Sequence, residues 1–149
     1  MKGEDEGMSF VDGDMTLGPG EGKAIPVPRH LLKATKWDTA GAYSMIEANV
    51  TGGGPPQHIH KAEEEAFYVL EGEVKIKVGE QTIRGTVGTF VVIPRGTVHT
   101  FWNAGPTPSK LLVIFSPPGF EQFFFEADGD EEIDMAEKYN IEVVGPPLE

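Results

Sequence analysis

The side chains with the clearest potential for chemistry are His58 and His60, followed by Glu65 and by the distant His99. Residues i and i+2 of a β-strand point to the same face, so a strand over this segment directs both His58 and His60 to one side. Neutral imidazole nitrogen and carboxylate oxygen suit Fe, Mn, Co, Ni, Cu and Zn. The residue types therefore predict one divalent transition metal held by His58, His60, Glu65 and His99. Three nitrogens and one oxygen would leave open positions on an octahedral ion, where a substrate could bind.

Glycines and prolines stand at fixed distances around these four residues. From Gly52 to Gly72 the chain reads G-x5-H-x-H-x4-E-x6-G, and from Gly88 to Asn103 it reads G-x5-P-x-G-x2-H-x3-N. With background frequencies near 5–7% for Gly and Pro, so many fixed positions do not coincide by chance. Both patterns are complete and in the order found in the cupin family, which the chain resembles. The resemblance implies a small all-β jelly roll, the double-stranded β-helix, with the metal inside the barrel.

The elements that must position the four residues are short strands. Glu65 begins a run in which it shares a face with Phe67, so its carboxylate is expected to point inward among apolar groups. Residues 57–116 contain six or seven short runs separated by turn residues, which is typical of an all-β sandwich or barrel. Two strands far apart in sequence can bring His99 to the other histidines only if the sheet closes on itself.

Three segments of different character follow from the composition along the chain. Residues 1–22 are rich in Gly, Asp and Glu, which predicts a flexible acidic N-terminal segment. Either Met1 or Met8 can be its biological start. Residues 23–118 are the predicted barrel. Residues 119–149 form a predicted helical extension packed on it.

The helices of this extension follow from apolar spacing. Phe120, Phe123 and Phe124 stand at i, i+3 and i+4, the spacing of one apolar helix stripe. Residues 131–139 predict a second short helix with Ile133 and Met135 on its inner side. We expect one or two short helices outside the barrel.

Composition excludes several classes of function. The formal net charge of −12 argues against nucleic-acid binding, because phosphate contacts need clustered Lys and Arg. The absence of cysteine excludes thiolate ligands and is consistent with a reducing compartment. No apolar stretch approaches the roughly 20 residues of a membrane helix. We therefore expect a cytoplasmic protein without a membrane or nucleic-acid partner.

A finer resemblance bears on activity. The segment Pro117-Pro118-Gly119-Phe120-Glu121 and the C-terminal tail are similar to small cupins described as quercetin-dioxygenase-like. This resemblance implies a metal-dependent oxygenase acting with O2 on an aromatic hydroxyl or an enediol. It also implies that Glu65, by its motif position, removes the hydroxyl proton as general base, while a role as metal ligand stays open. Cupins frequently pair, so a homodimer is expected.

Two other functions are compatible with the same motifs: a non-catalytic cupin that binds a small ligand, and a sugar isomerase or epimerase. Outside the motifs, His30 is expected to be structural or exposed, and Arg84 and Arg95 to be solvated rather than to steer an anionic substrate. Gln57 is a weaker candidate for a hydrogen bond behind the metal ligands. Of Glu63 and Glu64, at least one must point outward.

Overall fold

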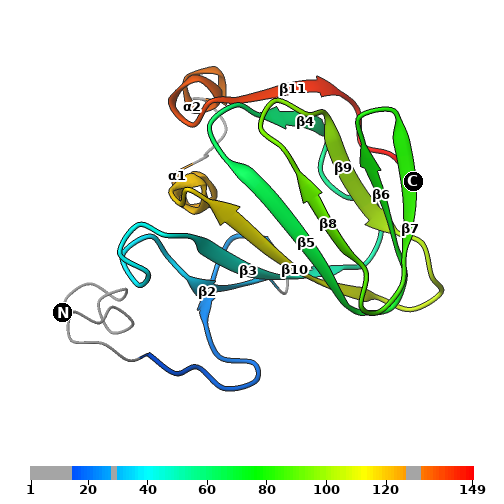
Figure 1. Ribbon diagram of the computed structural model, residues 1–149, viewed down its shortest axis with the longest axis horizontal. Helices are drawn as coiled ribbons and strands as arrows, with labels where there is room; N and C mark the ends of the chain where they lie inside the picture. The colour runs from blue at the N-terminus through cyan, green and yellow to red at the C-terminus, as the bar shows by residue number, and fades with distance from the viewer. Residues whose placement is uncertain (1–14, 28–29, 127–131) are drawn as a thin grey trace.

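The fold consists of two antiparallel β-sheets packed face to face (Figure 1). It is known from a computed structural model, which describes residues 15–27, 30–126 and 132–149, with the side chains of 132–134 left out. The larger sheet contains, in spatial order, β1 (Lys23–Ala24), β2 (Leu31–Ala34), β3 (Ser44–Val50), β10 (Ser109–Ser116), β5 (Glu64–Glu71) and β8 (Phe90–Ile93). The smaller contains β11 (Ile141–Gly145), β4 (Gln57–His60), β9 (His99–Asn103), β6 (Val74–Val78) and β7 (Gln81–Gly85).

This arrangement confirms the predicted all-β class and is consistent with the double-stranded β-helix. Seven strands, β4 to β10, lie in residues 57–116, as the turn spacing predicted. Strands far apart in sequence are neighbours, since β10 pairs with β3 on one side and with β5 on the other. The closure that His99 requires is therefore present.

The core lies between the two sheets and follows the period of two. In β10 the side chains of Leu111, Val113 and Phe115 are buried and alternate with less buried neighbours. Phe67 of β5, in the larger sheet, and Ile76 of β6, in the smaller sheet, are both completely buried in this core. Each such side chain contributes roughly 1.5–3 kcal/mol of burial free energy, which fixes the faces of the strands that carry the functional residues.

Two glycines, Gly72 of the first motif and Gly54 within its variable positions, are required by close approach of the backbone. Gly72, between β5 and β6, has φ of +75°, and a Cβ there would lie 2.7 Å from the Cβ of Ser109. Gly54, just before β4, lies so close to Phe101 that a Cβ would overlap the carbonyl oxygen of that residue. Glycine is therefore the residue that lets the loop before β4 rest against β9.

The C-terminal extension covers one end of the sheets (Figure 1). A 3₁₀ turn (Phe120–Gln122) leads into α1 (Phe123–Glu126), and α2 (Glu132–Lys138) follows, which agrees with the predicted short helices. Buried side chains anchor both parts, Phe120 in the turn and Met135 in α2. The extension is not entirely helical, because β11 adds a strand that the sequence analysis did not predict.

Some predictions concern residues outside the described part of the chain. The alternative starts Met1 and Met8, most of the acidic N-terminal segment and the side chain of Ile133 fall there. Within the described residues, no helix combines the length and apolar character needed to cross a membrane.

Candidate metal centre

Three strands from the two sheets bring the four predicted ligands together. His58 and His60 are buried on β4, with the less buried Ile59 between them, as a period of two requires. β9 is antiparallel to β4 and pairs His99 directly with His58. Glu65, the second residue of β5, enters from the opposite sheet and is buried.

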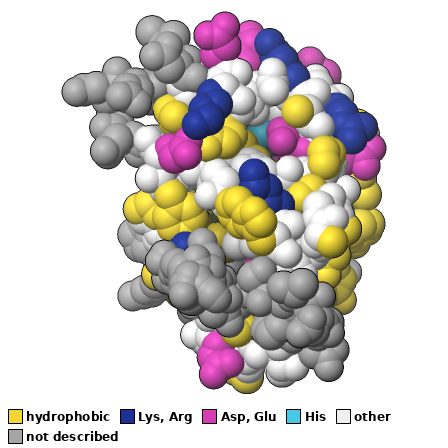
Figure 2. All heavy atoms as spheres, turned by 90° about the vertical axis from the view of Figure 1, so that its left-hand side faces the viewer, with side chains coloured by type: hydrophobic (Ala, Val, Ile, Leu, Met, Phe, Trp, Pro, Cys, Tyr) yellow, Lys and Arg dark blue, Asp and Glu magenta, His cyan; other side chains and the backbone are white. Residues whose placement is uncertain are grey.

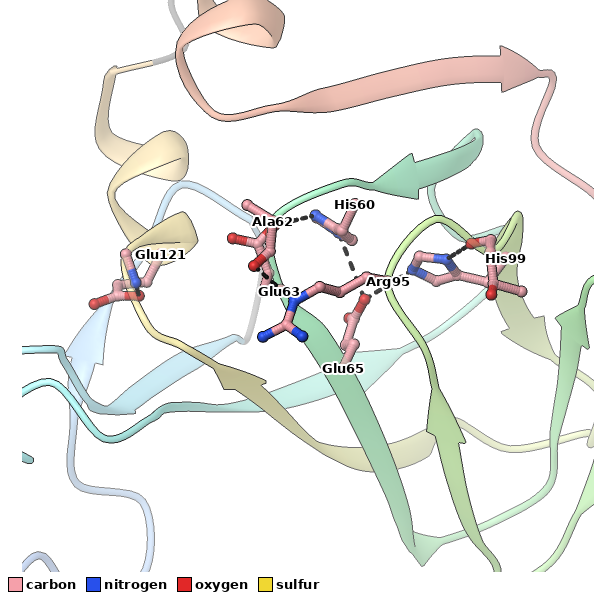
Figure 3. Close-up of polar contacts among 9 residues, drawn as sticks. His60, Ala62, Glu63, Glu65, Arg95, His99 and Glu121 are labelled. Atoms are coloured by element: carbon pink, nitrogen blue, oxygen red, sulfur yellow. Dashed lines mark hydrogen bonds and ion pairs between the residues drawn. The ribbon is translucent and has the colours of Figure 1, made fainter.

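The donor atoms of these four residues converge on one point. One ligand atom from each lies within 4.8 Å of the others. Glu65 Oε1 is 2.8 Å from His99 Nε2 and 3.5 Å from His60 Nε2 (Figure 3). The rings of His58 and His99 have centroids 4.3 Å apart. Sequence positions separated by some forty residues thus form one compact cluster of three imidazoles and a carboxylate.

Hydrogen bonds at the back of two imidazoles fix their tautomers. His58 Nδ1 lies 2.7 Å from the carbonyl oxygen of Pro56, and His99 Nδ1 lies 2.9 Å from that of Thr97. A carbonyl oxygen only accepts, so each Nδ1 carries the proton and donates it. The Nε2 lone pairs are then available inside the cluster. Three neutral imidazoles and one carboxylate match the donor set of a divalent transition metal, so the residues present fit such an ion.

Burial and mutual charge set the protonation of the cluster. Burial and, to a smaller extent, the neighbouring His99 lower the pKa of His58 to about 4, so His58 is neutral near pH 7. Burial alone would raise the pKa of Glu65, but the hydrogen bond from His99 and the imidazoles around it outweigh burial and lower it. Burial lowers the pKa of His99, and the hydrogen bond and charge of Glu65 outweigh that effect and raise it. Without a cation, Glu65 and His99 therefore stabilise each other's charged forms.

A cavity of about 580 Å³ opens beside the cluster, and His58, His60 and Glu65 contribute to its wall. Its remaining surface is mainly apolar. The barrel strands, the loop before β4, the C-terminal extension, and Val27 and His30 before β2 supply it. Its aromatic rings are those of Phe101, Phe115, Phe120, Phe123 and Phe124. A mostly apolar cavity with a few convergent polar groups is the usual form of a small-molecule site.

Surface side chains are mixed on the face of the molecule toward which the N-terminal strands and α1 lie. Figure 2 shows hydrophobic side chains gathered there beside acidic and basic ones, with histidine surface visible between them. Tyr43 and Phe125 are among the exposed large hydrophobic residues of the described chain.

Several weaker sequence candidates take roles away from the cluster. Arg84 pairs with Glu73 at 2.6 Å on the surface, and Arg95 Nε donates to the carbonyl oxygen of Ala62. The side-chain amide of Gln57 donates to the carbonyl oxygen of Pro146 at 3.1 Å.

His30 was expected to be structural or exposed. It is half-buried and lines the cavity, which is compatible with a structural role. Val27, three residues earlier, lines the same cavity.

Sequence reasoning also missed Glu63, which is buried behind His60. Its Oε1 lies 3.3 Å from His60 Nδ1. The signal was present, because Glu63, Glu65 and Phe67 are spaced two residues apart and side chains at this spacing point to the same face of a strand. Glu64 is the exposed one of the pair.

Comparison with known proteins agrees with this geometry. The family described as Cupin_2, a cupin domain, matches residues 46–115. An uncharacterized protein of Streptomyces coelicolor is 31% identical over 80 residues, which are 54% of this chain and 70% of that protein. Quercetin 2,3-dioxygenase of Bacillus subtilis is 28% identical over 96 residues, covering 64% of this chain and 28% of the enzyme.

Solved structures include similar folds. The polyketide cyclase RemF from Streptomyces resistomycificus superimposes with a TM-score of 0.60 at 25% identity, over 69% of this chain and 79% of the cyclase. Several curated relatives are longer: the chain spans about half or less of the quercetin dioxygenase and of germin-like proteins of Arabidopsis thaliana.

Proposed function

The chain belongs to the cupin family, and we propose that it is a metal-dependent oxygenase of quercetinase-like type. Its substrate would be a small molecule with an aromatic hydroxyl or an enediol, and O2 its co-substrate. His58, His60, Glu65 and His99 would hold one divalent transition metal. The observation that carries the proposal is the contact between this four-residue cluster and a largely apolar, aromatic cavity.

The cavity favours a neutral aromatic substrate. A volume of about 580 Å³ lies within the usual range of small-molecule sites. None of the described residues that line it is a lysine or an arginine. A phosphorylated sugar would lack a cationic partner there, which speaks against the sugar isomerase or epimerase alternative. Offset or edge contacts from Phe120 and Phe123, whose rings stack at 5.0 Å, suit a planar ring.

The chain's own residues would orient the substrate and take its proton. The metal, when bound, would act as a Lewis acid and lower the pKa of a substrate hydroxyl. Glu65 is the one carboxylate among the four donors, so the hydroxyl proton would move to its Oε1. The phenylalanines around the cavity would exclude water and hold the aromatic ring beside Glu65. Glu65 would thus serve as base while His58, His60 and His99 remain in place.

Oxygen uptake tests this proposal. The purified protein is stripped of metal, reconstituted separately with Fe, Mn, Co, Ni, Cu and Zn, and mixed with a flavonol such as quercetin while dissolved O2 is recorded. We expect uptake with at least one metal, loss of uptake in Glu65→Gln and His99→Ala, and normal uptake in the exposed control Glu64→Gln. Uptake that is absent with every metal and every polyphenol tried would refute the oxygenase.

Two outcomes would indicate other functions. Tight retention of a small molecule that survives Glu65→Gln, without turnover, would identify the non-catalytic ligand-binding alternative. A second enzymatic candidate is ring closure of a polyketide, favoured by the similarity to the cyclase RemF. Such a cyclisation consumes no O2, so product formation from a polyketide in anaerobic buffer separates it from the oxygenase.

We further propose that the protein is a homodimer. The outer face of the larger sheet carries Tyr68 and Phe90, registered neighbours on β5 and β8, and Val92; these three are 42%, 60% and 49% exposed. Adjacent exposed apolar groups next to an edge strand are typical of a contact surface. Sedimentation equilibrium should show a dimer that Phe90→Glu dissociates and Val87→Glu, on the nearby turn, does not. A monomeric wild-type protein at all concentrations would contradict this.

A further inference from the structure

We propose that Glu63 is a positioning residue for the metal ligand His60, and this inference depends on the proposed metal binding. Glu63 is 6% exposed, and its Oε1 lies 3.3 Å from Nδ1 of His60, which is 2% exposed. Within the described part of the chain, neither atom has a hydrogen-bond partner. A buried carboxylate oxygen and a buried ring nitrogen, each otherwise unsatisfied, thus face one another behind the ligand.

The backbone holds Glu63 in this place. It lies in the bend between β4 and β5, and hydrogen bonds fix that bend from two sides. The N–H of Gly96 donates to the carbonyl oxygen of His60 at 2.9 Å. Arg95 Nε donates to the carbonyl oxygen of Ala62 at 3.0 Å (Figure 3). From the C-terminal side, the N–H of Lys61 donates to the carbonyl oxygen of Asn140 at 2.9 Å. The direction of the Glu63 side chain is therefore set by the fold.

The partner of His60 differs in kind from those of the other two imidazoles. His58 and His99 donate from Nδ1 to neutral carbonyl oxygens. A carboxylate is a stronger acceptor than a carbonyl, because the hydrogen bond is charge-assisted. By accepting from Nδ1, the Glu63 carboxylate would keep the proton there and direct the Nε2 lone pair of His60 to the cluster.

A structural role does not account for Glu63 equally well. A buried carboxylate costs free energy unless it is paired, and folding alone would favour an apolar residue of similar size. Glu63→Leu should therefore leave the folding of the metal-free protein intact. The benefit of the carboxylate would appear only when His60 acts as a ligand.

Metal affinity and the tautomer of His60 test the proposal. The variants are Glu63→Gln, which keeps an acceptor without the charge, and Glu63→Leu, which removes both. Zn²⁺ affinity is measured by competition with a chelator, and the melting temperature of the metal-free protein checks folding. We expect a loss of roughly tenfold for Glu63→Gln and up to about 100-fold for Glu63→Leu. The matched control Glu64→Gln, exposed on the next residue, should bind Zn²⁺ like the wild type.

Ring ¹⁵N spectra of the metal-free protein give a second readout that needs no metal. In the wild type, His60 should be protonated at Nδ1; in Glu63→Leu, the preference for that tautomer should be lost. Zn²⁺ affinities within twofold of the wild type in both Glu63 variants, or an unchanged His60 tautomer in Glu63→Leu, would overturn the proposal. A wild type that binds no Zn²⁺ or other divalent metal would instead overturn the proposed function and, with it, this role of Glu63.

Discussion

The two sides of the site are built from different kinds of sequence. The cluster side consists of motif residues on β4, β5 and β9, with fixed spacings and a backbone hydrogen bond behind His58 and His99. The cavity side is built largely from residues outside the motifs, including the phenylalanines of the extension and residues of β11. The comparison indicates that metal binding and substrate selectivity depend on different sets of residues. Changes to side chains of the cavity should therefore leave metal affinity intact, whereas β11 belongs to both sides because it also pairs with the ligand strand β4.

The largest expected effect comes from the cluster side. His99→Ala removes a nitrogen donor and the hydrogen-bond partner of Glu65 at once. We expect Zn²⁺ affinity to fall by more than the roughly 100-fold upper figure for an outer-sphere partner. Chelator competition measures the loss. Retention of full affinity would show that His99 is not a ligand and that the cluster does not act as one site.

Deleting residues 141–149 tests whether β11, which lines the cavity, also supports the metal centre. β11 pairs with β4 over residues 141–145, opposite His58 and His60, while β9 supplies one registered pair. Without β11, the strand that carries two ligands becomes an edge with unpaired backbone groups. We expect a loss of ten- to 100-fold in Zn²⁺ affinity and a lower melting temperature.

The control for that deletion is Val144→Thr, a change on β11 at a side chain 44% exposed, which keeps the backbone pairing. It should behave like the wild type. If the deletion binds Zn²⁺ normally, β11 is a wall of the cavity and not a support of the metal centre.

The pH dependence of metal affinity tests the Glu65–His99 pair. Because Glu65 raises the pKa of His99, Nε2 of His99 carries a proton that a metal must displace. Below that raised pKa, affinity should fall about tenfold for each unit by which the pH drops; above it, affinity should level off. His58, with a pKa lowered to about 4, should add to the slope only near and below that pH.

Calorimetric titration in buffers of different ionisation enthalpy measures the protons released. We expect about one proton per metal ion at a pH below the raised pKa of His99. Metal affinity that does not change with pH across this range would show that His99 Nε2 is not protonated in the metal-free protein.

The smallest effect is expected from the cavity side. Phe123 is half-buried and its ring stacks on Phe120. Phe123→Ala should raise the KM for an aromatic substrate by roughly tenfold, about 1.4 kcal/mol, and leave Zn²⁺ affinity unchanged. Steady-state kinetics combined with chelator competition checks both. A tenfold loss of Zn²⁺ affinity in Phe123→Ala would contradict the separation of metal binding from substrate selectivity.

Local sequence rules explain the success of several predictions. A period of two placed His58, His60 and Glu65 on inner faces, and the structure has all three buried. The i, i+3, i+4 phenylalanines predicted the helical turn that begins the extension. The same period of two predicts that Glu63 points inward. The residue was missed because it lies between two strands, where the period was not applied.

Other features had no local signal. The segment 141–145 was not predicted as a strand, and it forms one by pairing with β4 at the edge of the smaller sheet. His30 reaches the cavity only because the chain around it crosses near the barrel strands. The strand and the position of His30 both depend on which distant segments pack side by side, and local sequence patterns do not predict this.

The residue order by itself determined the four donors, their faces and the turns between their strands, because the two-residue period and glycine's backbone freedom act over a few residues. Only the tertiary structure decided that the donors meet, that Glu63 stands behind His60, and that aromatic rings of the extension enclose the cavity. These outcomes follow from closure of the two sheets, a long-range packing event in which apolar faces separated by many residues are buried against each other.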